Sequence, residues 1–438
     1  MLEEEKFEKW RRGIGLYVGP ILMLIILFEP MPYLSKEAHH LLAILILIVV
    51  YWVSEAIPLA VTSLLVPILC IILDVCSEKD AFINFAHPII FLFLGSFILA
   101  RAMELTAIDR IIAIRILSIK WVRKSAMRFT FVFSFIIFFL SWWLSNTATT
   151  AMMFPIAISL IKRLEDITGI EVKKFGLGLM VLTAYSSSIG GVATPVGTPP
   201  NLIGIGMLDK MVDTKISFFQ WMLITVPLCL IIFTAVFFYM YFTNIKEIRK
   251  YWRKEVFLDF PKSELKLRTE QWNVIIPFSI TVILWVFPGL IMLIKGSNSK
   301  IYMLLSTYIT ESNAALIGVV LLFILPAIKR DKRENISWRK LININWEAIF
   351  LFGAGLTLGT LMFQTKLSNS IADYVLGHIK EPTLWKFTLL FSMLTGAITE
   401  LTSNTATANM AIPLAISLAK EANVSFLVPT LAATIGCS

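Results

Sequence analysis

The most constraining feature of the 438-residue sequence is a series of apolar segments that recurs from end to end. Many of them reach the roughly 20 residues that a helix needs to cross a bilayer. Only 16% of the residues are charged, whereas soluble proteins average about 25%. Inside a bilayer a helix satisfies its own backbone polar groups. We therefore predict an all-α, polytopic membrane protein, and we exclude a soluble enzyme and a disordered chain.

Two apolar segments, 129–161 and 383–419, are too long for one span, and each carries a polar cluster at its centre. The clusters are Ser145-Asn146-Thr147 and Ser403-Asn404-Thr405. Divided there, each half has about 16 residues, which is short of the ~20 that a span needs. This favours two re-entrant helical hairpins, which enter the membrane, turn at the polar tip and leave by the same face.

The distribution of positive charge supports this topology. With a cytoplasmic N-terminus and two hairpins that return to the side they entered, 28 of the 39 Lys and Arg residues lie on the cytoplasmic side. Such an excess is the positive-inside signal of membrane proteins. Two short complete spans in place of each hairpin would give the same count of cytoplasmic Lys and Arg residues, so that alternative stays open. The net charge of +9 follows from topology, and we expect no nucleic-acid partner.

The two polar clusters belong to an internal repeat. Residues 145–160 and 403–418 agree at 11 of 16 positions with an offset of 258, and the same offset pairs Ser141 with Thr399. Self-similarity of this kind indicates a duplicated architecture. Because the first hairpin opens to the cytoplasm and the second to the outside, the two repeats are inverted. Inverted repeats with broken helices are typical of secondary transporters.

Each tip can offer ligands for ions. A half-helix that ends there presents free carbonyl oxygens, and the half-helix that begins there presents free amides. The i, i+4 spacing predicts that Ser141 and Ser145 share one helical face, and Asn146 adds an amide oxygen. Hard oxygen ligands of this kind suit Na⁺. Thr147 and Thr405 begin the following half-helices, where hydroxyl and N–H groups could hold a carboxylate.

A third interruption is expected at residues 190–201, which contain three glycines and three prolines. Proline and glycine disfavour a continuous helix, so we predict an unwound transmembrane segment whose carbonyls coordinate ions, with a purely structural kink as the alternative. Neither tip sequence contains Lys or Arg. A bound anion would therefore need cations and helix dipoles to offset its charge, since an isolated buried charge is costly.

The paired Ser-Asn-Thr tips, the stretch Gly197-Thr198-Pro199-Pro200-Asn201 and the stretch Thr399-Glu400-Leu401-Thr402 resemble the divalent-anion/sodium symporter family. This family includes sodium-dependent dicarboxylate transporters. The resemblance implies a homodimeric elevator in the lipid bilayer, with Na⁺ as coupling ion and no organic cofactor. The family carries a second break, and the offset puts the partner of Thr198 at position 456, beyond Ser438. We therefore expect the sequence to be a fragment.

The resemblance also implies ligands residue by residue. One sodium site would use Ser141, Ser145, Asn146 and the carbonyl of Gly197. The other sodium site would use Thr399, Thr402, Ser403 and Asn404. The substrate would contact Ser145, Asn146, Thr147, Thr198, Ser403, Asn404 and Thr405.

The domain organisation expected from this resemblance alternates between scaffold and transport segments. The predicted segments are scaffold 1–128 with a cytoplasmic amphipathic helix, transport 129–243, a cytoplasmic amphipathic linker 244–271, scaffold 272–382 and transport 383–438.

The function expected is sodium-coupled symport of a C4-dicarboxylate such as succinate, malate or fumarate across the cell membrane. Sodium-independent dicarboxylate exchange, or transport of citrate or sulfate, stays open. An enzyme with a Ser or Thr nucleophile would need a base within reach, yet neither hairpin contains His and Glu400 is the only carboxylate near a tip. We therefore expect no enzymatic activity. An ion channel would need rings of ligands around an axis, which nothing in the sequence indicates.

Overall fold

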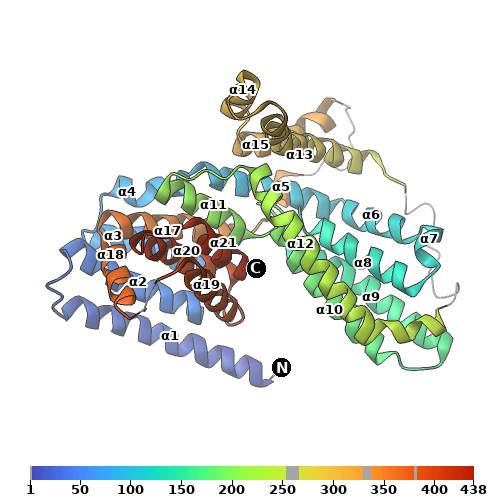
Figure 1. Cartoon of the computed structure of the whole chain (residues 1–438), viewed down its shortest axis with the longest axis horizontal. Coiled ribbons are helices and arrows are strands. Elements are labelled where there is room, and N and C mark those ends of the chain that lie inside the picture. The colour runs from blue at the N-terminus through green and yellow to red at the C-terminus, as the bar shows by residue number, and fades with distance from the viewer. Residues whose placement is uncertain (1, 253–265, 329–336, 379–381) are drawn as a thin grey trace. The chain divides into compact units, whose positions relative to one another are not determined.

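The computed structural model describes residues 2–252, 266–328, 337–378 and 382–438. All regular structure within these ranges is helical, with no strand, which confirms the predicted all-α class (Figure 1). Seven of the described helices are long and apolar enough to cross a membrane, or up to eight if the bent pair α14–α15 forms one span. The seven are α1 (Leu2–Phe28), α2 (Lys36–Ser54), α5 (Pro88–Leu105), α10 (Lys173–Val192), α12 (Phe218–Met240) with the following turn η2 (Tyr241–Ile245), α13 (Thr269–Lys295) and α17 (Trp346–Gln364).

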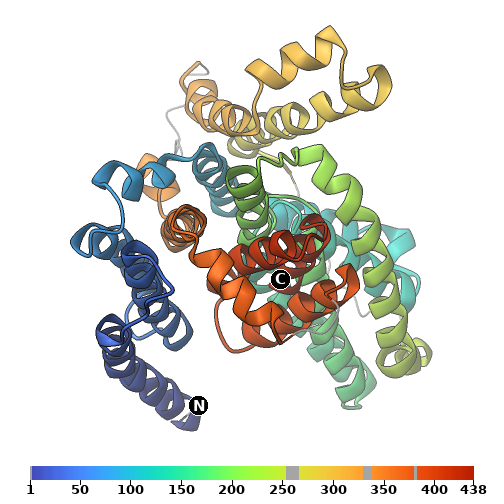
Figure 2. The same cartoon turned by 60° about the vertical axis from the view of Figure 1, so that its left-hand side comes forward.

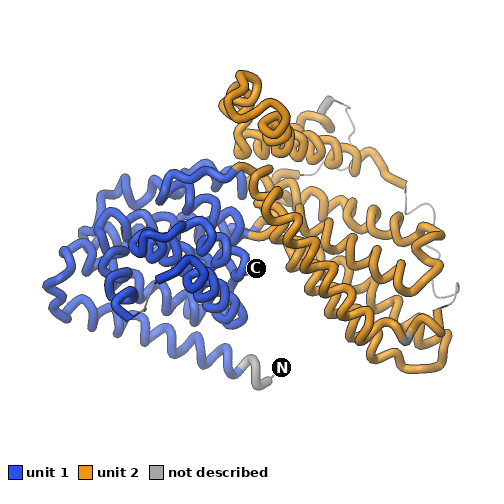
Figure 3. The backbone as a smooth tube through the Cα atoms, in the orientation of Figure 1, with its two compact units in different colours: residues 1–93, 199–216, 345–438 blue, residues 94–198, 217–344 orange. Residues whose placement is uncertain are grey.

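The chain folds into two compact units and passes between them several times (Figure 3). The first unit comprises residues 1–93, 199–216 and 345–438, and the second comprises residues 94–198 and 217–344. The predicted scaffold and transport segments remain predictions. Within the predicted linker 244–271, residues 253–265 lie outside the described residues.

The first unit packs its helices around a core that several elements share. Trp52 from α2, Leu351 from α17 and Ala406 from α20 are all buried in this core. Figure 2 shows the last three helices, in orange to red, gathered together. Besides the spans above, the unit contains α3 (Leu59–Ile72), α4 (Glu78–Ile83), η1 (Asn84–Ala86), α11 (Pro199–Val212), α18 (Leu367–Leu376), α19 (Leu384–Thr399), α20 (Asn404–Glu421) and α21 (Leu427–Gly436).

The second unit has its own core, to which the two arms of the first hairpin contribute. Phe133 from α8, Met153 from α9 and Leu182 from α10 are fully buried there. Besides the spans above, this unit contains α6 (Ile108–Leu117), α7 (Lys120–Arg123), α8 (Ala126–Leu140), α9 (Asn146–Thr168), η3 (Lys246–Tyr251), α14 (Lys300–Tyr308), α15 (Glu311–Ile328) and α16 (Trp338–Leu341).

Both long apolar segments break at their polar clusters. In the first, α8 ends at Leu140 and α9 begins at Asn146; in the second, α19 ends at Thr399 and α20 begins at Asn404. The prediction that Ser141 and Ser145 share a helical face is wrong. Tight turns follow Leu140, with the amides of Trp143 and Leu144 both bonded to its carbonyl. The helix therefore stops, and Ser145 adopts an extended conformation as the N-cap of α9.

The third interruption is shorter than predicted. α10 continues to Val192, and α11 begins at Pro199, so only residues 193–198 are non-helical. Gly190 and Gly191 remain helical because their role is close packing: a Cβ on either would lie 2.1 Å from an oxygen atom of the first hairpin. Pro199 occupies the first helical position of α11, where its missing N–H costs nothing.

Candidate functional site

The first tip is organised by hydrogen bonds around Asn146. The hydroxyl of Ser141 donates to Oδ1 of Asn146 at 2.7 Å, and its oxygen lies 3.3 Å from the hydroxyl of Ser187 on α10. Ser187 in turn donates to the backbone carbonyl of Asn146 at 2.7 Å. Ser141 and Ser187 are fully buried. The structure therefore gathers two buried hydroxyl oxygens and the amide oxygen of the half-buried Asn146 at one place.

Two glycines allow the backbone of α10 and of the break to approach this cluster. A Cβ on Gly191 would lie 2.1 Å from Oδ1 of Asn146. A Cβ on Gly197 would lie 2.5 Å from the carbonyl oxygen of Gly191 and 2.8 Å from that of Ser141. Of the predicted sodium ligands in this half, Ser141, Asn146 and Gly197 are thus brought together, with carbonyl oxygens beside them.

Two carbonyls, one at the end of α10 and one at the start of the break, already have partners. The indole N–H of Trp221 donates to the carbonyl of Val192 at 3.0 Å, and Thr225 donates to that of Ala193 at 2.9 Å. Both donors belong to α12. Buried carbonyls need such partners, so the carbonyls that α12 satisfies are less available to an ion than the sequence alone suggests.

The predicted substrate contacts of the first tip have different surroundings. The hydroxyl of Ser145 accepts the amide N–H of Ala148 at 3.2 Å, which is an ordinary N-cap bond. Ser145 and Thr147 are exposed, whereas Thr198 is buried. Ser145 and Thr147 therefore lie at the open start of α9, and the structure does not join them to the buried cluster.

The second tip repeats the central bond of the first. The hydroxyl of Thr399 donates to Oδ1 of Asn404 at 2.7 Å, the same length as the equivalent bond 258 residues earlier. It also lies 3.1 Å from the carbonyl oxygen of Cys437. The sequence repeat is therefore also a repeat of local geometry.

The remaining predicted residues of the second tip surround that bond. The hydroxyl of Thr402 is buried and has no hydrogen-bond partner among the described residues. Ser403 precedes α20 and makes no side-chain cap bond. Thr405 is buried, and its carbonyl accepts the side-chain N–H of Asn409 at 2.9 Å. Thr402 thus has an oxygen atom that a ligand could use.

A charged side chain from a distant segment of the chain contacts the second tip. Arg11 of α1 donates from Nη1 to the carbonyl oxygen of Leu401 at 3.0 Å, and its Nη2 lies 3.4 Å from a carboxylate oxygen of Glu55. The tip sequences themselves lack positive residues. Sequence reasoning missed Arg11 because nothing local links residues 390 positions apart.

Ser187 was also missed, although a signal existed. It stands four residues before Gly191, so both fall on the same face of a helix. A serine and a close-packing glycine on one face would have indicated that this face approaches the first hairpin.

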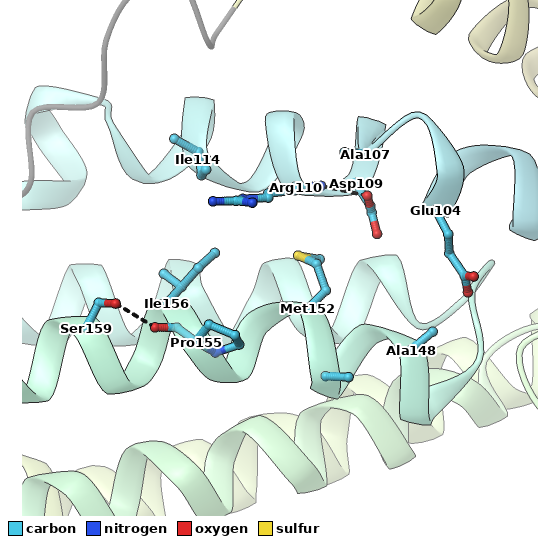
Figure 4. A pocket seen from close by; sticks show the side chains of 11 residues that line it. Glu104, Ala107, Asp109, Arg110, Ile114, Ala148, Met152, Pro155, Ile156 and Ser159 are labelled. Atoms are coloured by element: carbon cyan, nitrogen blue, oxygen red, sulfur yellow. Dashed lines mark hydrogen bonds between the residues drawn. The ribbon is translucent and has the colours of Figure 1, made fainter. Parts of the chain in front are cut away.

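A cavity of about 510 Å³ lies beside α9 in the second unit (Figure 4). Its lining runs from Ala148 to Ser159 along α9 and includes Glu104, Asp109 and Arg110. Asp109, at the start of α6, is 5% exposed, and burial, with a smaller contribution from the charge of Glu104, raises its carboxyl pKa to about 6. This cavity includes none of the predicted site residues.

The two clusters offer neutral, hard oxygen atoms from hydroxyl, amide and carbonyl groups. Such donors suit a hard cation, and the donor chemistry therefore fits Na⁺. Within the described ranges, no group of three or more His, Cys, Asp or Glu side chains is placed to hold a metal.

Apolar helices of membrane-spanning length, broken around clusters of uncharged oxygen atoms, define a membrane transport protein and not an enzyme. A family model described as "Citrate transporter" matches residues 49–436. The chain belongs to this family, and the predicted resemblance to sodium-dependent dicarboxylate transporters is confirmed.

Individual relatives agree with this assignment. The chain is 32% identical over 421 residues to a sodium-dependent dicarboxylate transporter, SdcS, of Staphylococcus saprophyticus, covering 94% of this chain and 79% of that protein. It is 30% identical to an uncharacterized transporter of Haemophilus influenzae, covering 100% of this chain and 89% of that one. Among solved structures, the YdaH transporter of Alcanivorax borkumensis, whose topology is described as unusual, shares the fold with a TM-score of 0.53 at 14% identity, covering 98% of this chain and 85% of that one.

Proposed function

We propose that this protein is a sodium-coupled symporter for C4-dicarboxylates such as succinate, malate or fumarate, and that it works as a homodimeric elevator in the cell membrane with a cytoplasmic N-terminus. The observation that carries the proposal is the duplicated bond from a hydroxyl to an asparagine oxygen, 2.7 Å in both tips. The names of the Staphylococcus relatives supply the ion and the substrate class.

The cation side of the proposal rests on the donor atoms. In the first tip, Ser141 and Asn146 contribute oxygen atoms that are bonded only to one another and to Ser187 among the bonds described above. In the second tip, Thr399, Asn404 and Thr402, whose hydroxyl has no hydrogen-bond partner within the described part of the chain, play the equivalent roles. A bound Na⁺ would replace the hydrogen bonds from the hydroxyls to the asparagine oxygens by contacts between the ion and these oxygen atoms. These contacts would stand in for the water molecules that the ion loses on binding.

The anion side rests on helix starts. α9 begins at Asn146 and α20 begins at Asn404, and the first turn of a helix presents free amides and a partial positive charge. A carboxylate of a dicarboxylate is the kind of anion that such a helix start binds. Bound Na⁺ ions would offset the charge that the helix starts alone cannot offset.

The test is uptake of radiolabelled succinate into proteoliposomes with and without an inward Na⁺ gradient. We expect uptake to depend on Na⁺ and not on K⁺ or on internal dicarboxylate. Uptake driven equally well by K⁺, or by succinate inside the vesicles, would refute symport and favour exchange. Because the matching family model is described as "Citrate transporter", uptake of labelled citrate is measured in parallel. Uptake of citrate without uptake of succinate would overturn the dicarboxylate assignment in favour of citrate.

Substitution of either asparagine tests the site itself. We expect Asn146→Ala and Asn404→Ala each to lower sodium-dependent uptake at least about tenfold, the equivalent of about 1.4 kcal/mol, because each removes the oxygen that accepts a 2.7 Å bond. Asn313→Ala is the control, since Asn313 is exposed and belongs to neither tip. Wild-type uptake by either tip variant would refute the assignment.

A further inference from the structure

The second tip is tied to the N-terminal helix by one guanidinium group. Nη1 of Arg11 donates to the carbonyl oxygen of Leu401 at 3.0 Å. Leu401 stands in the turn between α19 and α20, directly before Thr402. Its side chain is 73% exposed, so the residue owes its position to its backbone and not to side-chain packing.

Glu55 fixes the direction of the guanidinium. Its carboxylate lies 3.4 Å from Arg11 and 3.3 Å from Arg12. Glu55 ends α2 in a left-handed conformation with φ of 49°, which a non-glycine residue adopts only when its surroundings enforce it. The side chain of Arg11 is 22% exposed and that of Arg12 is 51% exposed. Of the two arginines, Arg11 is therefore the one turned inward and held at the tip.

The position of this contact matters electrostatically. α19 ends at Thr399, and the C-terminal end of a helix carries a partial negative charge and carbonyls without helical partners. A guanidinium is always charged and presents several donors in a fixed plane. Arg11 therefore supplies a tethered positive charge beside the residues that the proposed function assigns to a sodium site.

The first tip is supported differently. The repeat pairs Leu401 with Trp143, whose ring stacks on Phe218 and Trp285 with centroids 6.3 and 6.5 Å away. The two tips thus have the same central hydrogen bond but different supports: aromatic packing at the first and a charged hydrogen bond at the second.

We propose that Arg11 is a positioning residue that latches the second tip in one state of the transport cycle. The latch rests on the proposed elevator movement and on the predicted division of the chain, which puts α1 and α2 in the scaffold segment, residues 1–128, and the tip in the transport segment, residues 383–438, whereas the structure groups all of them in the first compact unit. A bond between segments that slide past each other must break during each cycle. Its formation favours one end state, and it competes with Na⁺ for the negative end of α19.

Thiol labelling tests the latch without any transport measurement. Leu401→Cys keeps the backbone carbonyl that Arg11 binds and adds a thiol at an exposed position. The rate of labelling by a membrane-impermeant maleimide is then compared in three backgrounds: Arg11→Gln, Arg12→Gln and neither substitution. Labelling of the native cysteines is measured separately, in the chain without Leu401→Cys. We expect Arg11→Gln to change the labelling rate at least about fivefold, and Arg12→Gln to leave it within about twofold.

Transport supplies the second readout. Arg11→Gln should shift the Na⁺ concentration for half-maximal uptake by about tenfold, whereas Arg12→Gln should not, although both residues contact Glu55. Arg11→Lys, which keeps the charge, should restore some of the wild-type sodium dependence and shows that a failure of Arg11→Gln is not misfolding. If Arg11→Gln and Arg12→Gln behave alike in both measurements, the latch is refuted. If wild-type protein shows no sodium-dependent uptake, the proposed function fails, while the labelling comparison still decides on the latch.

Discussion

Gly191→Ala perturbs the first cluster through a single methyl group. Gly191 lies on α10, and an added Cβ would stand 2.1 Å from Oδ1 of Asn146 and 2.9 Å from its Cγ. Because real Cβ atoms keep at least 3.0 Å from such neighbours, the amide oxygen has to retreat by about 0.9 Å. The 2.7 Å bond that it accepts from Ser141 cannot survive such a movement.

The cost of this movement has two components. Overpacking of a close-packed interior costs about 1–3 kcal/mol, and the loss of one neutral hydrogen bond costs about 0.5–1.5 kcal/mol. We therefore expect the free energy of unfolding to fall by roughly 2–4 kcal/mol. If Oδ1 of Asn146 is a sodium ligand, the Na⁺ concentration for half-maximal uptake should also rise at least about tenfold.

Gly176→Ala on the same helix is the matched control. Its Cβ would meet only Ile161, at 3.5 Å, which is an ordinary contact. Both variants are purified, their thermal unfolding is followed in detergent, and sodium-dependent uptake is measured after reconstitution. A Gly191→Ala protein with the stability and sodium dependence of the Gly176→Ala protein would refute the geometry and the ligand role of Asn146 together. Lower stability with unchanged sodium dependence would refute the ligand role alone.

Two further predictions concern stability. The pKa of Asp109 is about 6 in the folded protein against 3.8 for an ordinary Asp carboxyl, so the folded state binds the proton more tightly than the unfolded state. The free energy of unfolding should therefore fall by roughly 3 kcal/mol as the pH rises from about 4 to about 6. Asp109→Asn should remove this dependence in thermal unfolding across that range, and a wild-type protein that gains stability over it would contradict the assignment. Gly355→Ala should lower the unfolding temperature, because its Cβ would lie 1.9 Å from Oδ1 of Asn409, an overpacking cost of about 1–3 kcal/mol. Gly359→Ala is its control, since the nearest atom is the flexible side chain of Met211 at 3.3 Å, and equal unfolding temperatures for the two variants would count against the packing.

The sequence was sufficient to predict features that depend on spacing and composition. Apolar length predicted helices, and the 258-residue offset predicted that residues 141 and 399 play equivalent roles beside Asn146 and Asn404, which the hydrogen bonds now describe in both tips. The position of the break after α10 was predicted correctly, but the predicted break, residues 190–201, is longer than the observed one, residues 193–198. A glycine that permits an unwound helix and a glycine that permits close packing look the same in a sequence, and only the neighbour at 2.1 Å distinguishes them.

Features that depend on contacts between distant segments could not be predicted from the sequence. The i, i+4 spacing led to the wrong prediction that Ser141 and Ser145 share a helical face. Spacing cannot show that the carbonyl of Leu140 accepts two turn amides and that the helix ends there. Arg11 stands in a charged N-terminal segment that composition explains equally well as a topology signal. Its hydrogen bond to Leu401 crosses 390 residues, so no local pattern predicts it.

The difference between the two tips follows from what a repeat duplicates. The motif copies the residues that the proposed function assigns to the ligand, and the hydroxyl-to-asparagine bond is accordingly 2.7 Å in both tips. The motif does not copy the residues outside it, so Trp143 packs among aromatic rings while Leu401 is held by a guanidinium. Aromatic packing is insensitive to salt, whereas a partly exposed ion pair is screened by it. Equivalent motif atoms therefore do not imply equivalent behaviour: the same substitution in the two tips acts on structures that different forces hold in place.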